Sequence, residues 1–209
     1  MIQPPHCDEA DFQEAFMNAR ILLIATGLLL VLPLSAARAQ VKTPITVVDL
    51  FDSAKPGQWV RLEGMPQEDQ SIQCSKAKVL TGAIQEDDWA LKGQVRSVDA
   101  ASRRLRIGRY AVRLQDTAKF KSPTNTLRSL SDVKLGMYVK VEGTFDEDGG
   151  FLARKLNDES ADVAKKPGNE RKISIQGKVD HVDANRKAIV LMGTTFVVSD
   201  NTQVSSVEY

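Results

Sequence analysis

The segment that decides the fold runs from residue 91 to residue 157 and opens with LKGQVRSVDA (residues 91–100). In this opening, apolar or small side chains alternate with polar ones, so that Leu91, Gly93 and Val95 share one face. Such alternation is typical of a half-buried strand. Gly93 indicates a bend or bulge inside that strand, because a residue without a Cβ tolerates the sharp coiling that a small barrel requires.

The rest of this segment predicts an all-β module with one short helix. Alternating patterns predict strands, and Leu127 and Leu130 are expected on the buried side of the helix. The expected elements after the first strand are strands at 104–107 and 110–114, a helix at 126–132, and strands at 137–145 and 151–156. A hairpin turn at 146–150 joins the last two strands. The order strand, strand, strand, helix, strand, strand is that of an OB-fold, a five-stranded, partly open barrel.

Parts of this segment are repeated on either side of it. GQVRSVDA (93–100) corresponds to GKVDHVDA (177–184), and GMYVKVEG (136–143) corresponds to GQWVRLEG (57–64). Residues 45–80 therefore read as a half module with a helix and two strands. Residues 172–207 read as the other half, with three strands.

The two half modules complement each other around the complete module at 91–157. Three strands alone leave exposed edges and an uncovered apolar face, so we expect the halves to combine into a second, discontinuous barrel. Residues 158–171 are the polar linker between them. The predicted fold class is all-β with short helices, with two OB-like five-stranded barrels, one contiguous and one discontinuous. Pairing between chains, or one merged sheet, are the alternatives.

Three motifs resemble a known family. The G-x-V-x-x-V-D-A opening, the stretch SLSDVKLGMYVKVEG (129–143) and the hairpin DGGFLA (148–153) are similar to a bacterial domain-of-unknown-function family, number 5666. The resemblance implies OB-like modules that occur, often repeated, in exported proteins. It implies no established activity, because these motifs are structural glycines and turns.

The N-terminus predicts export. An apolar run at 21–34 follows Arg20 and precedes Ala37-Arg38-Ala39, a small-x-small cleavage pattern. Residues 17–39 are therefore a predicted signal peptide, cleaved after Ala39, which leaves no membrane span and places the mature chain in the periplasm or outside the cell. Residues 1–16 carry four acidic residues and no Lys or Arg, the wrong charge for a segment before such a run. We interpret them as a mis-annotated extension, with the true start at Met17.

Composition is that of an ordinary globular protein. The chain has 209 residues, 42% of them hydrophobic and 26% charged, with a net charge of +1. That balance gives no argument for a nucleic acid or membrane-surface partner. Cys74 is the one cysteine after the signal, so no internal disulfide is expected. Such a residue is usually a small core residue and less often an intermolecular bridge or reactive thiol.

No pattern in the sequence points to catalysis, a metal or a cofactor. The mature chain has one histidine, His181, on the polar side of a predicted strand. The His and Cys spacing of a zinc site is absent. Asp146-x-Asp148-Gly149 lacks the later ligands of a calcium loop, so a hairpin turn is the better interpretation. We therefore predict no catalytic residues, no metal site, no cofactor and no enzymatic activity.

Two surface features are candidates for binding. The first is an arginine-rich hairpin, which could hold a polyanion or could be an ordinary solvated face. The second is an outward aromatic residue with a basic residue two positions later. Proteins that bind single-stranded nucleic acids use such pairs. Packing against the neighbouring barrel would explain the pairs equally well. These candidate residues are Arg104, Arg106, Arg109 and Arg113 in the hairpin, and Trp59 with Arg61 and Tyr138 with Lys140 in the strands.

The sequence thus predicts an exported, non-enzymatic binding or interaction protein of the cell envelope. The alternative is a polyanion or oligosaccharide binder that uses the arginine-rich hairpin. The expected partner is an envelope protein or an anionic glycan, and nucleic acid is not expected.

Overall fold

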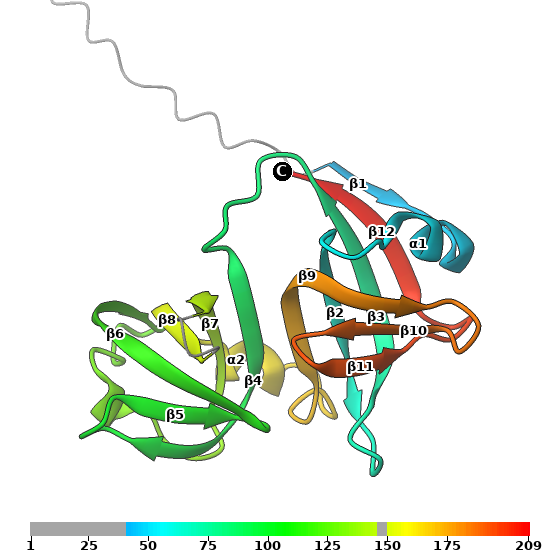
Figure 1. Cartoon of the computed structure of the whole chain (residues 1–209). Helices are drawn as coiled ribbons and strands as arrows, with labels where there is room; N and C mark the ends of the chain where they lie inside the picture. Colours follow the sequence, from blue (N-terminus) through cyan, green and yellow to red (C-terminus); the bar gives the residue numbers. More distant parts are fainter. Residues whose placement is uncertain (1–40, 146–149) are drawn as a thin grey trace, which may run out of the picture. The chain divides into compact units, whose positions relative to one another are not determined.

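The computed structural model describes residues 41–145 and 150–209 (Figure 1). The predicted signal peptide, the predicted extension before it and residues 146–149 of the predicted hairpin turn lie outside these ranges. The described chain is mostly β. Its elements are β1 Val41–Pro44, α1 Val47–Ser53, β2 Trp59–Pro66, β3 Ile72–Thr81, β4 Trp89–Asp99, β5 Arg104–Ile107, β6 Tyr110–Lys121, the 3-10 turn η1 Leu130–Asp132, β7 Tyr138–Phe145, β8 Phe151–Asp158, α2 Ser160–Ala164, β9 Ile173–Asp183, β10 Ala188–Leu191, β11 Thr194–Val197 and β12 Gln203–Glu208.

The twelve described strands form one large mixed sheet. Most neighbours are antiparallel, but β6 pairs with β8 in parallel, and β3 pairs with both β11 and β12 in parallel. Parallel neighbours cannot be joined by a tight hairpin, so each of these pairs brings together strands that are separated along the chain.

Each strand from β4 to β8 has two neighbours within that segment. β4 pairs with β5, β5 with β6, β6 with β8, β8 with β7, and β7 pairs back to β4. The residues predicted to face inward are buried: Leu91 and Val141 lie opposite each other and are fully covered, and Val95 is 1% exposed. The alternation in LKGQVRSVDA therefore marks the buried face of β4 as expected.

Strands β2 and β3 pair with strands from the far end of the chain. β2 pairs with β9 over six residue pairs, from Trp59 opposite Lys178 to Gly64 opposite Ile173. β3 pairs with β11, and β10 lies between β11 and β9. In Figure 1 these strands, cyan and orange, lie side by side although about a hundred residues separate them.

The repeated motifs end at equivalent structural features. Gly64 in β2 and Gly143 in β7 each sit where the register with the next strand shifts by one residue. A Cβ at either position would lie 2.1 Å from a backbone carbonyl oxygen, that of Gln73 or Leu152. Both positions therefore require glycine for the same reason, a bulge that brings two backbones together.

Some elements differ from the sequence prediction. The predicted helix at 126–132 is only η1, because the Asp132 carboxylate accepts the backbone N–H groups of Arg128 and Ser129 and closes the chain into one turn. Leu127 and Leu130 are nevertheless buried, as predicted. β12 was not predicted. Its pairing partners β1 and β3 are both distant in sequence.

Strand β9 connects two groups of strands, the first from β4 to β8 and the second made of β2, β3, β10 and β11. It pairs with β2 on one side and, through residues 174–176, with β4 on the other. The rings of Trp59 and Trp89 meet beside it with centroids 5.3 Å apart, and Trp89 also meets the Phe145 ring at 4.9 Å. Gly177 makes room for this contact, since a Cβ there would lie 2.1 Å from the Trp89 ring.

Candidate functional site

The two aromatic residues predicted as ligand contacts are buried inside the protein. Trp59 is 9% exposed and packs on Trp89, and Tyr138 is 5% exposed. The Tyr138 hydroxyl donates to the backbone carbonyl of Lys172 at 2.9 Å. Both rings lie on the face that the alternation predicted, but other parts of the chain cover that face at these two positions, so both rings are buried.

Their basic companions, Arg61 and Lys140, lie on one polar surface, which we call the cross-strand face. It crosses strands β3, β2, β9, β4 and β7, which are all antiparallel neighbours. Directly opposite residues of antiparallel strands point to the same side, so the register defines its rows. One row is Lys78, Arg61, Gln176, Ala90 and Glu142, and the next is Lys76, Glu63, Ser174, Lys92 and Lys140. A groove of about 220 Å³ follows these rows.

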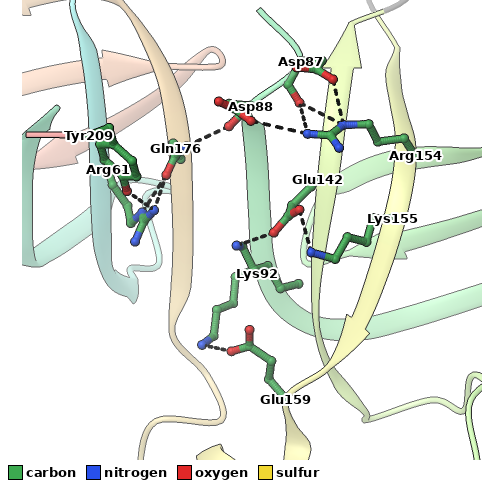
Figure 2. Close-up of polar contacts among 11 residues, drawn as sticks. Arg61, Asp87, Asp88, Lys92, Glu142, Arg154, Lys155, Glu159, Gln176 and Tyr209 are labelled. Atoms are coloured by element: carbon green, nitrogen blue, oxygen red, sulfur yellow. Dashed lines mark hydrogen bonds and ion pairs between the residues drawn. The ribbon is translucent and has the colours of Figure 1, made fainter. Parts of the chain in front are cut away.

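At the β4–β7 end of this face, the cations have carboxylate partners (Figure 2). Glu142 accepts from Lys140 and, at 3.0 Å, from Lys155, and Lys92 pairs with Glu159. Burial raises the pKa of Glu142, but the hydrogen bonds and positive charges of the two lysines outweigh it, so its pKa is lowered overall. Charge at this end is therefore balanced within the protein.

At the β2–β3 end, Lys76 has a long contact of 3.8 Å with Glu63, but Arg61 and Lys78 have no carboxylate partner in the described chain. The Arg61 guanidinium donates to the Gln176 side-chain oxygen at 2.8 Å and to the Tyr209 hydroxyl at 2.9 Å, both neutral groups (Figure 2). Lys78, directly opposite Arg61, makes no ion pair with a carboxylate of the described ranges. Burial and the charges of nearby cations, Arg61 first, lower the pKa of Lys78.

The segment between β3 and β4 is fastened at this surface. Asp87 pairs with Arg154 of β8 at 3.0 Å, and the backbone carbonyl of Asp88 accepts from the Gln176 side-chain amide at 2.8 Å (Figure 2). The Gln176 side chain is 8% exposed, and its two hydrogen bonds connect the Asp88 carbonyl to the Arg61 guanidinium. The hydrogen bond from Arg61 to Gln176 therefore fixes the orientation of the Arg61 guanidinium.

The arginine-rich hairpin of β5 and β6 contributes to a second concavity, which we call the arginine hollow. Its volume is about 450 Å³. Four arginines line it, Arg96, Arg106, Arg109 and Arg171, together with the apolar side chains of Ile72 and Ile173 and the ring of Tyr110. Within the described ranges, none of the four guanidinium groups forms an ion pair with a carboxylate.

One of these arginines is held in place by neutral groups. Arg109 donates to the Gly193 carbonyl at 2.9 Å and to the Thr194 hydroxyl at 2.7 Å, and its guanidinium lies 5.5 Å from the centre of the Tyr110 ring. The Tyr110 hydroxyl is hydrogen-bonded to the same threonine. The Arg109 guanidinium is therefore held in one orientation by neutral groups, and no negative charge in these contacts offsets its positive charge.

The other two predicted arginines are not in the hollow. Arg104 and Arg113 lie opposite each other in β5 and β6 and are exposed. The structure thus divides the predicted arginine cluster, placing Arg106 and Arg109 in the hollow and the other pair outside it. Sequence reasoning missed Arg96 and Arg171, which come from β4 and from the segment before β9.

Comparison with protein-family models matches residues 92–157 to a domain of unknown function. Residues 92–157 are a DUF5666 domain. Comparison with curated proteins and with solved structures finds no match for the chain. The boundaries agree with the module predicted at 91–157, and they enclose nearly all of the segment from β4 to β8.

The arginine hollow extends beyond the DUF5666 domain. The domain supplies Arg96, Arg106 and Arg109, whereas Arg171 and the apolar residues Ile72 and Ile173 come from outside its boundaries. The cross-strand face is composite in the same way, since β4 and β7 belong to the domain and β3, β2 and β9 do not. Both candidate surfaces therefore need more of the chain than the domain alone.

Other chemistry is not assembled in the described ranges. They hold no group of three His, Cys, Asp or Glu side chains placed to bind a metal ion, and no helix in them is long and apolar enough to cross a membrane. Cys74 is buried and free, and burial raises the pKa of its thiol to about 12. His181 lies exposed on β9.

Proposed function

We propose that this protein is an exported, non-enzymatic binding protein whose ligand is anionic and occupies the arginine hollow. One observation carries the proposal: four arginines line a concavity of about 450 Å³, and no carboxylate of the described chain pairs with any of them. Guanidinium groups recognise carboxylate, sulfate and phosphate groups through paired hydrogen bonds. A ligand would supply the negative charge that the protein does not.

The lining of the hollow favours a ligand with both anionic and less polar parts. Ile72, Ile173 and the Tyr110 ring offer apolar contact beside the arginines. An acidic glycan has this combination, with charged groups on sugar rings whose C–H faces pack on apolar surfaces. Single-stranded nucleic acid is less suited, because binders of that class stack successive bases on several aromatic rings. Tyr110 is the one aromatic residue in the lining of the hollow, and Trp59 and Tyr138 are buried.

The proposed framework is a pair of OB-like five-stranded barrels. One is contiguous, at 91–157, and the other is discontinuous, built from 45–80 and 172–207. The support is the pairing of strands, in which β4 to β8 form a closed circuit, and β9, β10, β11, β3 and β2 form an equivalent one. In each circuit the third and fifth strands are parallel, as in an OB-fold. OB-folds bind oligosaccharides and oligonucleotides, which agrees with a binding role by analogy only.

The proposed location is the periplasm or the cell exterior, after cleavage of residues 17–39. The apolar run and the Ala37-Arg38-Ala39 pattern support this. Edman sequencing or mass spectrometry of protein from the cell envelope tests it, with Gln40 as the expected first residue.

Binding to heparin, an acidic glycan, tests the arginine hollow. The triple variant R96Q/R106Q/R171Q removes three exposed charges and leaves the side-chain hydrogen bonds of Arg109 to Gly193 and Thr194 in place. We expect it to bind heparin at least about tenfold more weakly, since each hydrogen bond to a charged group contributes roughly 1.5–3 kcal/mol. A column run in a salt gradient gives the first measurement, and titration calorimetry gives the Kd.

The matched control is R104Q/K121Q/R186Q, which makes the same change in net charge at exposed positions that do not line the hollow. We expect this control to keep most of the affinity. Equal losses in both triple variants would mean that only overall charge matters, and the proposed site would be wrong.

A further inference from the structure

We propose that the β2–β3 end of the cross-strand face is a second, separate site, which binds a tetrahedral oxyanion such as phosphate or sulfate between Arg61 and Lys78. This site is distinct from the arginine hollow and does not depend on it. Its ligand is the oxyanion group itself, whether free or carried on a larger molecule.

The first observation is a pair of like charges at one cross-strand position. Arg61 in β2 lies directly opposite Lys78 in β3. Like charges in this arrangement destabilise a sheet, and the other cations of the face are relieved by carboxylates. Lys92 and Lys140, also directly opposite each other, have Glu159 and Glu142. Among the described residues, no carboxylate forms an ion pair with Arg61 or with Lys78.

The second observation is that Arg61 is oriented without being neutralised. Its partners are the Gln176 side-chain oxygen and the Tyr209 hydroxyl. Gln176 is almost fully buried and is itself anchored to the Asp88 carbonyl. A polar network therefore fixes the guanidinium in place and leaves its full charge available, as anion sites require.

The third observation is the excess of positive charge around this pair. Lys76 lies two residues before Lys78 on the same side of β3, and the charge of Lys42 of β1 also acts on Lys78. Among the described residues, the carboxylate beside these cations is Glu63, which is shared between Lys76 at 3.8 Å and Lys172 at 3.7 Å, both long contacts. Burial lowers the pKa of Lys78 most, followed by the charges of Arg61, Lys42 and Lys76, and the charge of Glu63 opposes this shift without reversing it.

The geometry fits a compact, doubly charged group. The groove of about 220 Å³ has room for an oxyanion with a few waters or a small substituent, given about 30 Å³ for each water in the liquid. The Arg61 fork can donate to two oxygens, and Lys78 adds a point charge from the neighbouring strand. A single carboxylate carries half of the charge and so is expected to bind more weakly.

The test is titration of the mature chain with inorganic phosphate and with sodium sulfate, followed by calorimetry and by the change in Tm, with acetate as the singly charged comparison. In Arg61→Gln and in Lys78→Gln, we expect the Kd for phosphate to rise at least tenfold. The hollow variant R96Q/R106Q/R171Q is expected to keep its phosphate Kd within about twofold. Loss of phosphate binding in that variant would assign the anion to the hollow and overturn the proposal.

Lys78→Gln also separates a binding role from a structural one. Without phosphate, its Tm should equal or exceed that of the unchanged protein, because the substitution removes repulsion from Arg61. With phosphate, the rise in Tm seen for the unchanged protein should be absent. A Lys78→Gln protein that is destabilised without phosphate, or that is still stabilised by it, would contradict the site.

Discussion

Cys74 is the residue whose environment gives the clearest pH dependence. Its side chain is 2% exposed, and burial raises the pKa of the thiol from 9.0 to about 12. In the unfolded chain the thiol loses its proton near pH 9, whereas in the folded protein it keeps the proton up to about pH 12. The contribution of the protonated Cys74 thiol to the free energy of unfolding is therefore fully present below pH 9, and it is lost as the pH rises from 9 to 12.

We expect the free energy of unfolding to fall by about 2 kcal/mol between pH 8 and pH 10.5 through this group. Urea unfolding at the two pH values measures the change. Cys74→Ala is the control, because it removes the thiol and should show a correspondingly smaller pH dependence. Equal slopes in the two proteins, or rapid alkylation of the native thiol at pH 8, would show that Cys74 is not shielded in this way.

Side-chain alternation predicted the faces of Trp59 and Tyr138 but not their exposure. Within one strand, the alternation says on which side a ring lies, and it says nothing about which distant segment covers that side. Trp89 and Lys172 provide that cover here. For the same reason, the sequence did not predict that Lys78 lies opposite Arg61, because this position follows from the register of β2 and β3 and not from either strand alone.

Strands β2 and β7 show how the repeated motif works as an element. Each ends in glycine at a register shift, and a Cβ at Gly143 would lie 2.1 Å from the Leu152 carbonyl oxygen. Backbone cannot move aside as a flexible side chain can. We expect Gly143→Ala to lower the free energy of unfolding by roughly 3 kcal/mol and to weaken hydrogen-exchange protection in β7 and β8.

Gly136→Ala is the comparison for this element. Gly136 has a positive φ of +84° but open space around it, with only the Gln94 amide nitrogen at 3.8 Å. It therefore reports the cost of backbone strain alone, about 1 kcal/mol, without a steric clash. If both variants lost the same stability, the close approach at the bulge would not be the reason for the glycine.

Elements with a strong local pattern were predictable, and those defined by distant pairing were not. β2, β4, β5 and β7 have clear alternation and were expected near their observed positions. β12 reads QVSSVE, with two apolar residues, and becomes a strand through pairing with β1 and β3. The predicted helix at 126–132 was wrong in length, because an aspartate that accepts the preceding N–H groups ended it after one turn.

At the scale of the whole molecule, β9 joins the DUF5666 domain to the rest of the chain. The repeats predicted that residues 45–80 and 172–207 would associate into a second barrel, and the structure has six residue pairs between β2 and β9. The repeats could not predict that β9 would also pair with β4, because each module considered alone leaves that edge unassigned. That second pairing creates the cross-strand face.

Leu62 and Val141 test whether the two groups of strands fold as separate units. They occupy equivalent positions in GQWVRLEG and GMYVKVEG, and both are fully buried. A buried, unpaired carboxylate costs several kcal/mol, enough to unfold the unit that contains it. We expect Leu62→Asp to abolish hydrogen-exchange protection in β2, β3 and β9 to β12 while β5 to β8 remain protected.

Val141→Asp should give the reverse pattern in the same measurement, with the DUF5666 domain unfolded and β10 to β12 protected. The three residue pairs between β4 and β9 are fewer than the six between β2 and β9, so the contact between the groups should open before either group does. Complete loss of protection in both variants would mean instead that the chain unfolds as one cooperative sheet. The proposed pair of barrels would then be wrong, and both binding surfaces would depend on a single folding event.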